Sequence, residues 1–175
     1  LPSTQTFTRS GLTFMTTTTV RNIDQPFDGT IGGSPDDLSP ADNKLVELEV
    51  MCTSCKNFRP TIFSTWVAPK DLEGASTNGA LFVRVMDSGG LPIQGADVHV
   101  VNTSLVPAVS VYDITSTSGM LQIIDAPPSV MSYQVSASKS GYSSDQTYGA
   151  PTTTNPVLPH STVAVQTVTQ VTLSI

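Results

Sequence analysis

The sequence predicts an all-β fold, with a small antiparallel sheet followed by a β-sandwich. Three observations support this expectation. The chain of 175 residues has only 13% charged residues, is rich in Ser and Thr, and contains 13 Pro and 12 Gly. Apolar and polar residues alternate over many short segments, which is the period of a half-buried strand. Turn-forming residues separate these segments at short intervals. We therefore expect almost no helix.

The first two expected strands form a hairpin over residues 5–20. Its turn, residues 9–11, ends on Gly11, which can adopt the positive φ that short hairpin loops often require. Alternation of Leu12 and Phe14 with threonines predicts that one face of the hairpin is turned inward. Residues 24–43 lack any period and are rich in Pro, Gly and Asp, which predicts a long loop.

Alternation returns in residues 44–51. Val46, Leu48 and Val50 share one face there, and the two glutamates of the segment point away from it. The next expected strand, residues 61–67, contains the single Trp of the chain. Together with the hairpin, these segments predict a small antiparallel meander with one side exposed to water.

A polar stretch without periodicity follows, and we interpret it as a linker between two domains. The expected division is a first domain at 1–70, a linker at 71–78 and a second domain at 79–175. The second domain has strands at the short spacing of a sandwich. These expected strands are residues 80–86, 96–102, 109–114, 119–124, 131–138 and 162–175. Apolar residues in the last of them fall on one parity, which predicts one buried face.

Four segments of the second domain resemble the carboxypeptidase regulatory-like family. They are residues 90–100, 117–121, 133–135 and 140–142, and the resemblance extends over about residues 79–175. It implies a seven-stranded transthyretin-like or Ig-like sandwich that serves as a non-catalytic spacer or binding module. Within this pattern, we expect Tyr142 to pack its ring into the sandwich as a plug.

Residues 4–67 resemble the C-terminal β region of type IV pilin-like and minor pseudopilin proteins. The resemblance rests on residues 12–20, 26–29 and 42–50, which form a hairpin, an Asp- and Gly-rich loop and a strand opening with Asp-x-Lys. It implies a pilin-like protein of a bacterial surface. The apolar N-terminal helix of that family is absent from this sequence, so we expect either a soluble headpiece or a chain that shares only the sheet.

The cysteines and histidines offer few candidates for catalysis. Cys52 and Cys55 form a Cys-x-x-Cys pair, which can be a redox centre, half of a zinc site or a local disulfide. The pair lies at a strand end, and His99 and His160 fall in the other expected domain. A local disulfide, or a pair of inert thiols, is therefore the favoured interpretation. Neither His lies in a hydrolase or metalloprotease motif. We predict no catalytic residue, no cofactor and no bound metal.

Four aspartates lie in one glycine-rich loop: Asp28, Asp36, Asp37 and Asp42. Crowded carboxylate oxygens are ligands that calcium prefers. The spacing does not match an EF-hand, and Asp is common in ordinary loops because its side chain bonds the local backbone. Calcium binding by these residues is therefore an open alternative to the prediction of no metal.

Charge and hydropathy restrict the expected partners. A net charge of −6 with 8 basic residues argues against nucleic acid, and no apolar run could span a membrane. The expected function is a non-catalytic extracellular structural subunit or display module of a pilus-like surface filament. The alternative is a surface adhesin that recognises glycan or protein through its loops. Expected partners are copies of the chain or other pilin-like subunits, and a host or environmental surface. The arm at residues 1–8 could join subunits by strand donation.

Overall fold

The computed structural model describes residues 3–68, 75–149 and 154–175. The secondary-structure elements in this part of the chain are twelve β-strands. No helix long and apolar enough to cross a membrane is found among the described residues. The predicted all-β class is confirmed. Residues 71–74 of the predicted linker lie outside the described residues.

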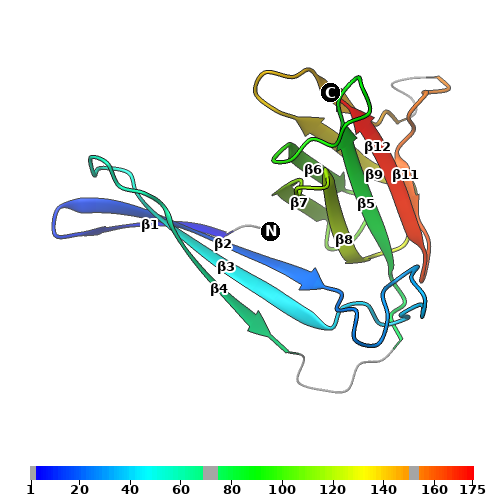
Figure 1. The fold of residues 1–175 in the computed structure, drawn as a ribbon, viewed down its shortest axis with the longest axis horizontal. Coiled ribbons are helices and arrows are strands. Elements are labelled where there is room, and N and C mark those ends of the chain that lie inside the picture. Colours follow the sequence, from blue (N-terminus) through cyan, green and yellow to red (C-terminus); the bar gives the residue numbers. More distant parts are fainter. Residues whose placement is uncertain (1–2, 69–74, 150–153) are drawn as a thin grey trace.

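The first four strands form an antiparallel meander in the order β1-β2-β3-β4 (Figure 1). Their bounds are β1 Ser3–Arg9, β2 Leu12–Ile23, β3 Asn43–Cys52 and β4 Thr61–Val67. The turn between β1 and β2 places Ser10 at φ 52° and Gly11 at φ 77°. Two successive positive φ angles match the twist of a two-residue hairpin. The predicted hairpin, loop and meander are all present.

The remaining strands form two facing sheets. Their bounds are β5 Gly79–Met86, β6 Asp97–Asn102, β7 Val109–Ile114, β8 Met120–Ala126, β9 Ser129–Ser138, β10 Ser144–Gln146, β11 Ser161–Val163 and β12 Val168–Ser174. One sheet has the order β10-β9-β6-β7, with β11 also paired to β9, and the other has the order β12-β5-β8. β5 and β12 run parallel, with Ala80 opposite Val168.

One apolar core fills the space between these two sheets. Strict alternation in β5 and β6 turns every second side chain into it. Its fully buried members include Leu81, Val83, Val85, Val98, Val100, Tyr133 and Leu173. Burial of each such side chain contributes about 1.5–3 kcal/mol relative to exposure. The core therefore stabilises the sandwich independently of the first sheet.

The aromatic plug of the sandwich is Tyr133, not Tyr142. Tyr133 is fully buried and its hydroxyl donates a hydrogen bond to the Pro127 carbonyl at 2.6 Å. Tyr142 is 48% exposed, and the Lys139 ammonium lies 5.6 Å from the centre of its ring. The prediction for Tyr142 is wrong because its turn lies beyond the end of β9, outside the layer between the sheets.

The last predicted strand, residues 162–175, is two strands rather than one. The chain leaves β11 after Val163, turns through Gln166 at φ 50°, and enters β12 at Val168. Val165 is consequently 49% exposed, although its parity predicted burial. Residues 75–149 and 154–175 thus contain eight strands instead of the seven expected. The break spans an even number of residues, so the apolar residues before and after it fall on the same parity. The alternation therefore gives no sign of the turn.

The loop between β2 and β3 lies beneath the ends of β5, β8 and β12 (Figure 1). Its Ile31 is 5% exposed and packs in a small apolar cluster with residues of β5, β8 and β12. The Leu38 carbonyl accepts a hydrogen bond from the Ser76 amide at 2.8 Å. This loop therefore forms the joint between the first sheet and the sandwich.

Candidate functional site

The four-stranded sheet has almost no core of its own. Of the residues in β1–β4, Cys52 alone is buried. Residues that stand opposite each other on paired strands project from the same face, so the register assigns the faces. One face collects the apolar side chains Phe7, Phe14, Val20, Val46, Leu48, Val50 and Phe63. We call this set the apolar face.

Most of the apolar face is not covered by the described part of the chain. Phe63 is 60% exposed, Val20 49% and Phe7 46%. The Phe7 and Phe14 rings stack at 5.6 Å, which shields them from water only in part. The alternation in residues 44–51 predicts this face correctly. The expectation that it is turned inward is wrong for most of the face. Only its end at Val20, Asn22 and Lys44 borders residues of β7 and β8, and no second layer of the described chain packs on the rest.

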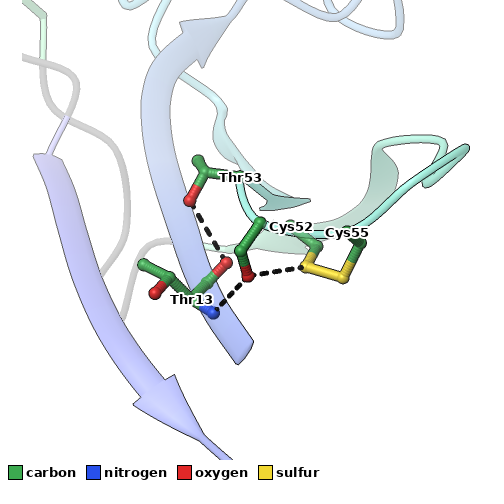
Figure 2. The surroundings of a disulfide bond; sticks show 5 residues. Thr13, Cys52, Thr53 and Cys55 are labelled. Carbon is green, nitrogen blue, oxygen red and sulfur yellow. Dashed lines mark hydrogen bonds between the residues drawn. A yellow bond between two sulfur atoms is a disulfide. The ribbon is translucent and has the colours of Figure 1, made fainter. Parts of the chain in front are cut away.

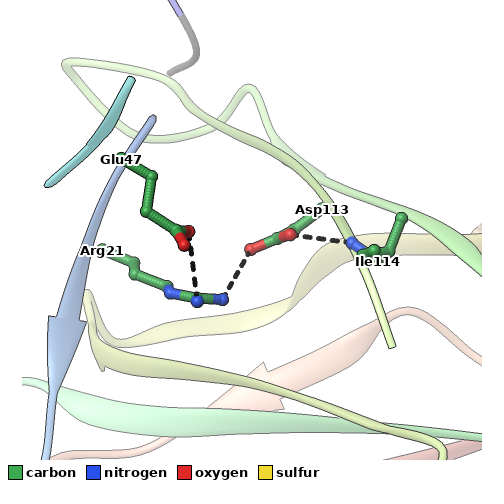
Figure 3. A network of polar contacts seen from close by, with 4 residues as sticks. All are labelled: Arg21, Glu47, Asp113 and Ile114. Carbon is green, nitrogen blue, oxygen red and sulfur yellow. Dashed lines mark hydrogen bonds and ion pairs between the residues drawn. The ribbon is translucent and has the colours of Figure 1, made fainter. Parts of the chain in front are cut away.

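The opposite face of the sheet carries charges and contacts the sandwich. Arg21 Nη2 lies 3.2 Å from Glu47 Oε2 on the neighbouring strand, and Arg21 Nη1 lies 3.6 Å from Asp113 Oδ2 in β7 (Figure 3). These side chains are all substantially exposed, so each pair contributes at most about 1 kcal/mol. Ile62 and Trp66 also project from this face.

β1 and β4 are the two edges of the sheet, and each is paired on one side only. All residues of both strands are exposed. The N-terminal arm that could be donated to a neighbour is instead paired with β2 along Ser3–Arg9. The arm occupies a place in its own sheet, so the structure presents two open edges rather than a free strand.

Cys52 and Cys55 are joined by a disulfide at the end of β3 (Figure 2). The turn that it closes is anchored to β2 through Thr13. The Thr13 amide donates to Ser54 Oγ at 2.8 Å, and the Thr13 carbonyl accepts from the Thr53 amide at 2.9 Å. The pair thus holds one end of a sheet that has little core to stabilise it.

Replacing both cysteines by serine is expected to lower the free energy of unfolding of the sheet by about 2 kcal/mol, because the bond closes only a short loop. Trp66, the single Trp of the chain, lies in β4 and reports on the sheet alone. Its fluorescence should show a lower urea midpoint in the variant, while the urea midpoint of the sandwich, followed by circular dichroism, should be unchanged. An unchanged Trp66 midpoint would contradict this role.

The loop between β2 and β3 brings three carboxylates together. One ligand atom from each of Asp24, Asp37 and Asp42 lies within 4.8 Å of the others. Burial raises the pKa of Asp24 above its ordinary value, and the neighbouring charges of Asp37, Asp42 and Asp28 raise it further, against a lowering by the Ile31 amide. Of the four aspartates considered from sequence, Asp37 and Asp42 join this cluster, whereas Asp28 and Asp36 are exposed.

His99 and His160 line one shallow hollow of about 270 Å³ on the sandwich. His99 Nε2 lies 3.2 Å from Ser110 Oγ. His160 Nδ1 lies 2.9 Å from Thr147 Oγ1. Burial lowers the pKa of His160. Both rings are on the sandwich and the disulfide is on the sheet, so the four residues of the alternative zinc site are not brought together.

Sequence reasoning missed two parts of this arrangement. Asp24 stands at the end of β2, outside the run of aspartates, and only the path of the loop brings it to Asp37 and Asp42. The uncovered state of the apolar face was also missed, because periodicity shows which residues share a face but not what packs on it.

No protein-family model and no curated protein matches the chain. Among solved structures, BcpA, the major pilin subunit of Bacillus cereus, is 14% identical with a TM-score of 0.36, over 75% of this chain and 37% of that one. A variant of BcpA is also 14% identical with a TM-score of 0.36, over 76% of this chain and 37% of that one. The Bacillus anthracis TIE protein is 12% identical with a TM-score of 0.37, over 98% of this chain and 39% of that one. The chain spans less than two fifths of each structure, and TM-scores below 0.5 assign it neither a family nor a function.

Proposed function

We propose that this chain is a non-catalytic structural subunit of an extracellular, pilus-like surface filament, in which copies associate through the apolar face. The observation that carries the proposal is the apolar face of β1–β4, whose side chains are exposed or half-buried in the described chain and never buried. A sheet normally buries its apolar face against a second layer. Contiguous exposed apolar surface on a protein marks an interaction site.

The distribution of charge favours a second copy as the partner. The strands β1–β4 and the β3–β4 connection are net basic, with Arg9, Arg21, Lys44, Lys56 and Arg59 against Glu47 and Glu49. The described sandwich is acidic, with Asp87, Asp97, Asp113, Asp125 and Asp145 against Arg84 and Lys139. Opposite potentials steer two copies toward a head-to-tail contact. The Arg21–Asp113 pair is a contact of this kind within one chain.

The strand order supports an open-ended assembly. β1 and β4 are edges of opposite direction, because each strand of the meander is antiparallel to the next. In addition to the contact through the apolar face, a copy displaced by translation can therefore bring its β1 beside β4 as another antiparallel neighbour. Head-to-tail contacts of this type continue indefinitely instead of closing into a dimer.

We further infer that the sheet is the assembly domain and the sandwich a spacer displayed by it, divided near residues 71–78. The apolar core of the sandwich supports this division, because it makes the sandwich a unit of its own. The resemblances to type IV pilin-like and carboxypeptidase regulatory-like proteins point the same way. A disulfide is characteristic of oxidising compartments, which supports an extracellular location.

A surface binding module is the second candidate, and one hollow on the sandwich favours it. Tyr148, Val157 and Leu158 line a mostly apolar depression of about 510 Å³ together with Asp145 and Thr172. An aromatic ring beside polar groups is suited to a glycan or a peptide. This candidate requires no self-association, which separates it from the filament subunit.

Replacing Phe63 by lysine is expected to weaken self-association by about 30-fold or more, because a charge would be desolvated in the apolar contact. Sedimentation over a wide concentration range should show assembly of the wild-type chain, and electron microscopy should show fibres. The Phe63→Lys chain should stay monomeric under the same conditions.

Ile62→Lys is the matched control, since Ile62 is 63% exposed on the same strand but projects from the charged face. It should assemble nearly as well as the wild type. Equal loss in both variants would contradict the apolar face as the contact. A wild-type chain that is a strict monomer at high concentration, without fibres, would contradict the filament subunit and leave the binding module.

A further inference from the structure

The three clustered aspartates each use one carboxylate oxygen in the same way. Asp24 Oδ2 accepts a hydrogen bond from the Ile31 amide at 2.9 Å, and Asp37 Oδ1 accepts one from the Ser39 amide at 2.7 Å. Asp42 Oδ2 accepts one from the Gln25 amide. These bonds fix the orientation of the three carboxylates within the loop between β2 and β3.

The second oxygen of each carboxylate is buried and has no hydrogen-bond partner among the residues that the structure describes. These atoms are Asp24 Oδ1, Asp37 Oδ2 and Asp42 Oδ1. Asp37 and Asp42 are each only 8% exposed. A buried, unpartnered carboxylate oxygen is costly, and three neighbouring ones repel each other as well. Such an arrangement is compensated when a cation binds between the oxygens.

We propose that Asp24, Asp37 and Asp42 form a binding site for one calcium ion. Two oxygens bound to the same calcium ion at about 2.4 Å lie no more than about 4.8 Å apart. The three ligand atoms of the cluster lie within 4.8 Å of one another, so each pair meets this limit for a shared ion. Further ligands would be water or carbonyl oxygens.

The chemistry of the donor set selects among metals. All three ligands are carboxylates, and hard oxygen ligands suit calcium and magnesium rather than zinc or copper. Magnesium requires near-ideal octahedral geometry and retains its water, whereas calcium accepts irregular sites with several protein oxygens. A cluster in which three protein carboxylates are held in place by three separate backbone amides is a site of the calcium type.

The position of the site assigns it a structural role. The same loop places Ile31 into the small cluster at the ends of β5, β8 and β12. Asp24 receives its hydrogen bond from this Ile31, so the carboxylate cluster and the joint share one backbone segment. A bound ion would therefore hold the first sheet at a defined angle to the sandwich.

The test uses the full chain, freed of metal with EDTA and titrated with CaCl₂. At a concentration about 100-fold above the dissociation constant, calcium is expected to raise Tm by about 5–10 °C. Isothermal titration calorimetry should give one site per chain. Absence of both binding and a Tm shift at millimolar calcium would overturn the proposal, and this measurement needs no variant to fold.

Asp37→Asn and Asp42→Asn keep an oxygen for the backbone amide but remove one charge each. Without calcium, both variants are expected to be at least as stable as the wild type, because a buried repulsion is relieved. Their affinity for calcium should fall about 10-fold or more. Asp28→Asn, an exposed change in the same loop, should leave the affinity within about 3-fold.

A merely structural role of Asp37 and Asp42 predicts the reverse result, in which the asparagine variants are less stable in EDTA and the wild type ignores calcium. That pattern would overturn the site. An equal Tm shift with MgCl₂ would overturn the assignment to calcium. Because these measurements are made on single chains, they are independent of whether copies associate.

Discussion

Substitution of Leu81 by alanine is expected to lower the free energy of unfolding by about 3–5 kcal/mol. Leu81 is fully buried in β5, the central strand of the sheet β12-β5-β8, and it packs in the core shared by both sheets. Its neighbours are held in strands on every side, so the cavity left by the lost atoms cannot collapse. Urea unfolding followed by far-UV circular dichroism measures the loss.

Leu91→Ala is the matched control for this change. Leu91 is 65% exposed in the turn after β5, and the same atoms are removed there without a cavity. The expected loss is below about 0.5 kcal/mol. Similar losses in both variants would mean that the core between the two sheets does not dominate the stability of the sandwich.

Substitution of Gly79 by alanine is expected to cost about 3 kcal/mol or more, although it adds a single methyl group. A Cβ at Gly79 would lie 2.0 Å from the Ala164 carbonyl oxygen and 2.9 Å from that of Thr167. Both atoms belong to the backbone of the turn between β11 and β12. That turn is fixed in place, because the Ala80 amide donates to the Thr167 carbonyl at 3.0 Å.

Gly89→Ala provides the comparison in thermal unfolding experiments. The nearest atom to a Cβ at Gly89 is the side-chain Oδ1 of Asp87, at 3.2 Å, so a small shift of this carboxylate is enough to accommodate the methyl group. We expect a change in Tm of only about 2 °C for Gly89→Ala, against about 6 °C or more for Gly79→Ala. Equal shifts in Tm would show that the turn between β11 and β12 moves to accommodate the Cβ at residue 79.

Period-two alternation was sufficient to locate most strands in advance. The strand predicted at 109–114 has the bounds of β7, and the strand predicted at 61–67 has those of β4. Both are bounded by Pro, Gly or Ser clusters that end a strand locally. The break at Gln166 was not visible, because a positive φ at Gln carries no signal in composition.

The candidate site was predictable only in part. The run of Asp and Gly residues identifies the loop between β2 and β3, since such residues are abundant in turns. Which carboxylates meet depends on backbone amides, such as that of Ile31, which orients Asp24. For the sheet, alternation assigns Val46 and Leu48 to one face, but the absence of a covering layer depends on where the sandwich lies.

The parallel pairing of β5 with β12 has a consequence for how the chain folds. Ala80 and Val168 are neighbours in the sheet although they are far apart in sequence, whereas β1 to β4 each pair with the next strand along the chain. Loop closure over such a distance slows the search for the native topology. The meander can form within microseconds to milliseconds of its synthesis, and the sandwich must wait until its final strand arrives. A nascent chain would therefore present its hairpins to solvent before the domain behind them is complete.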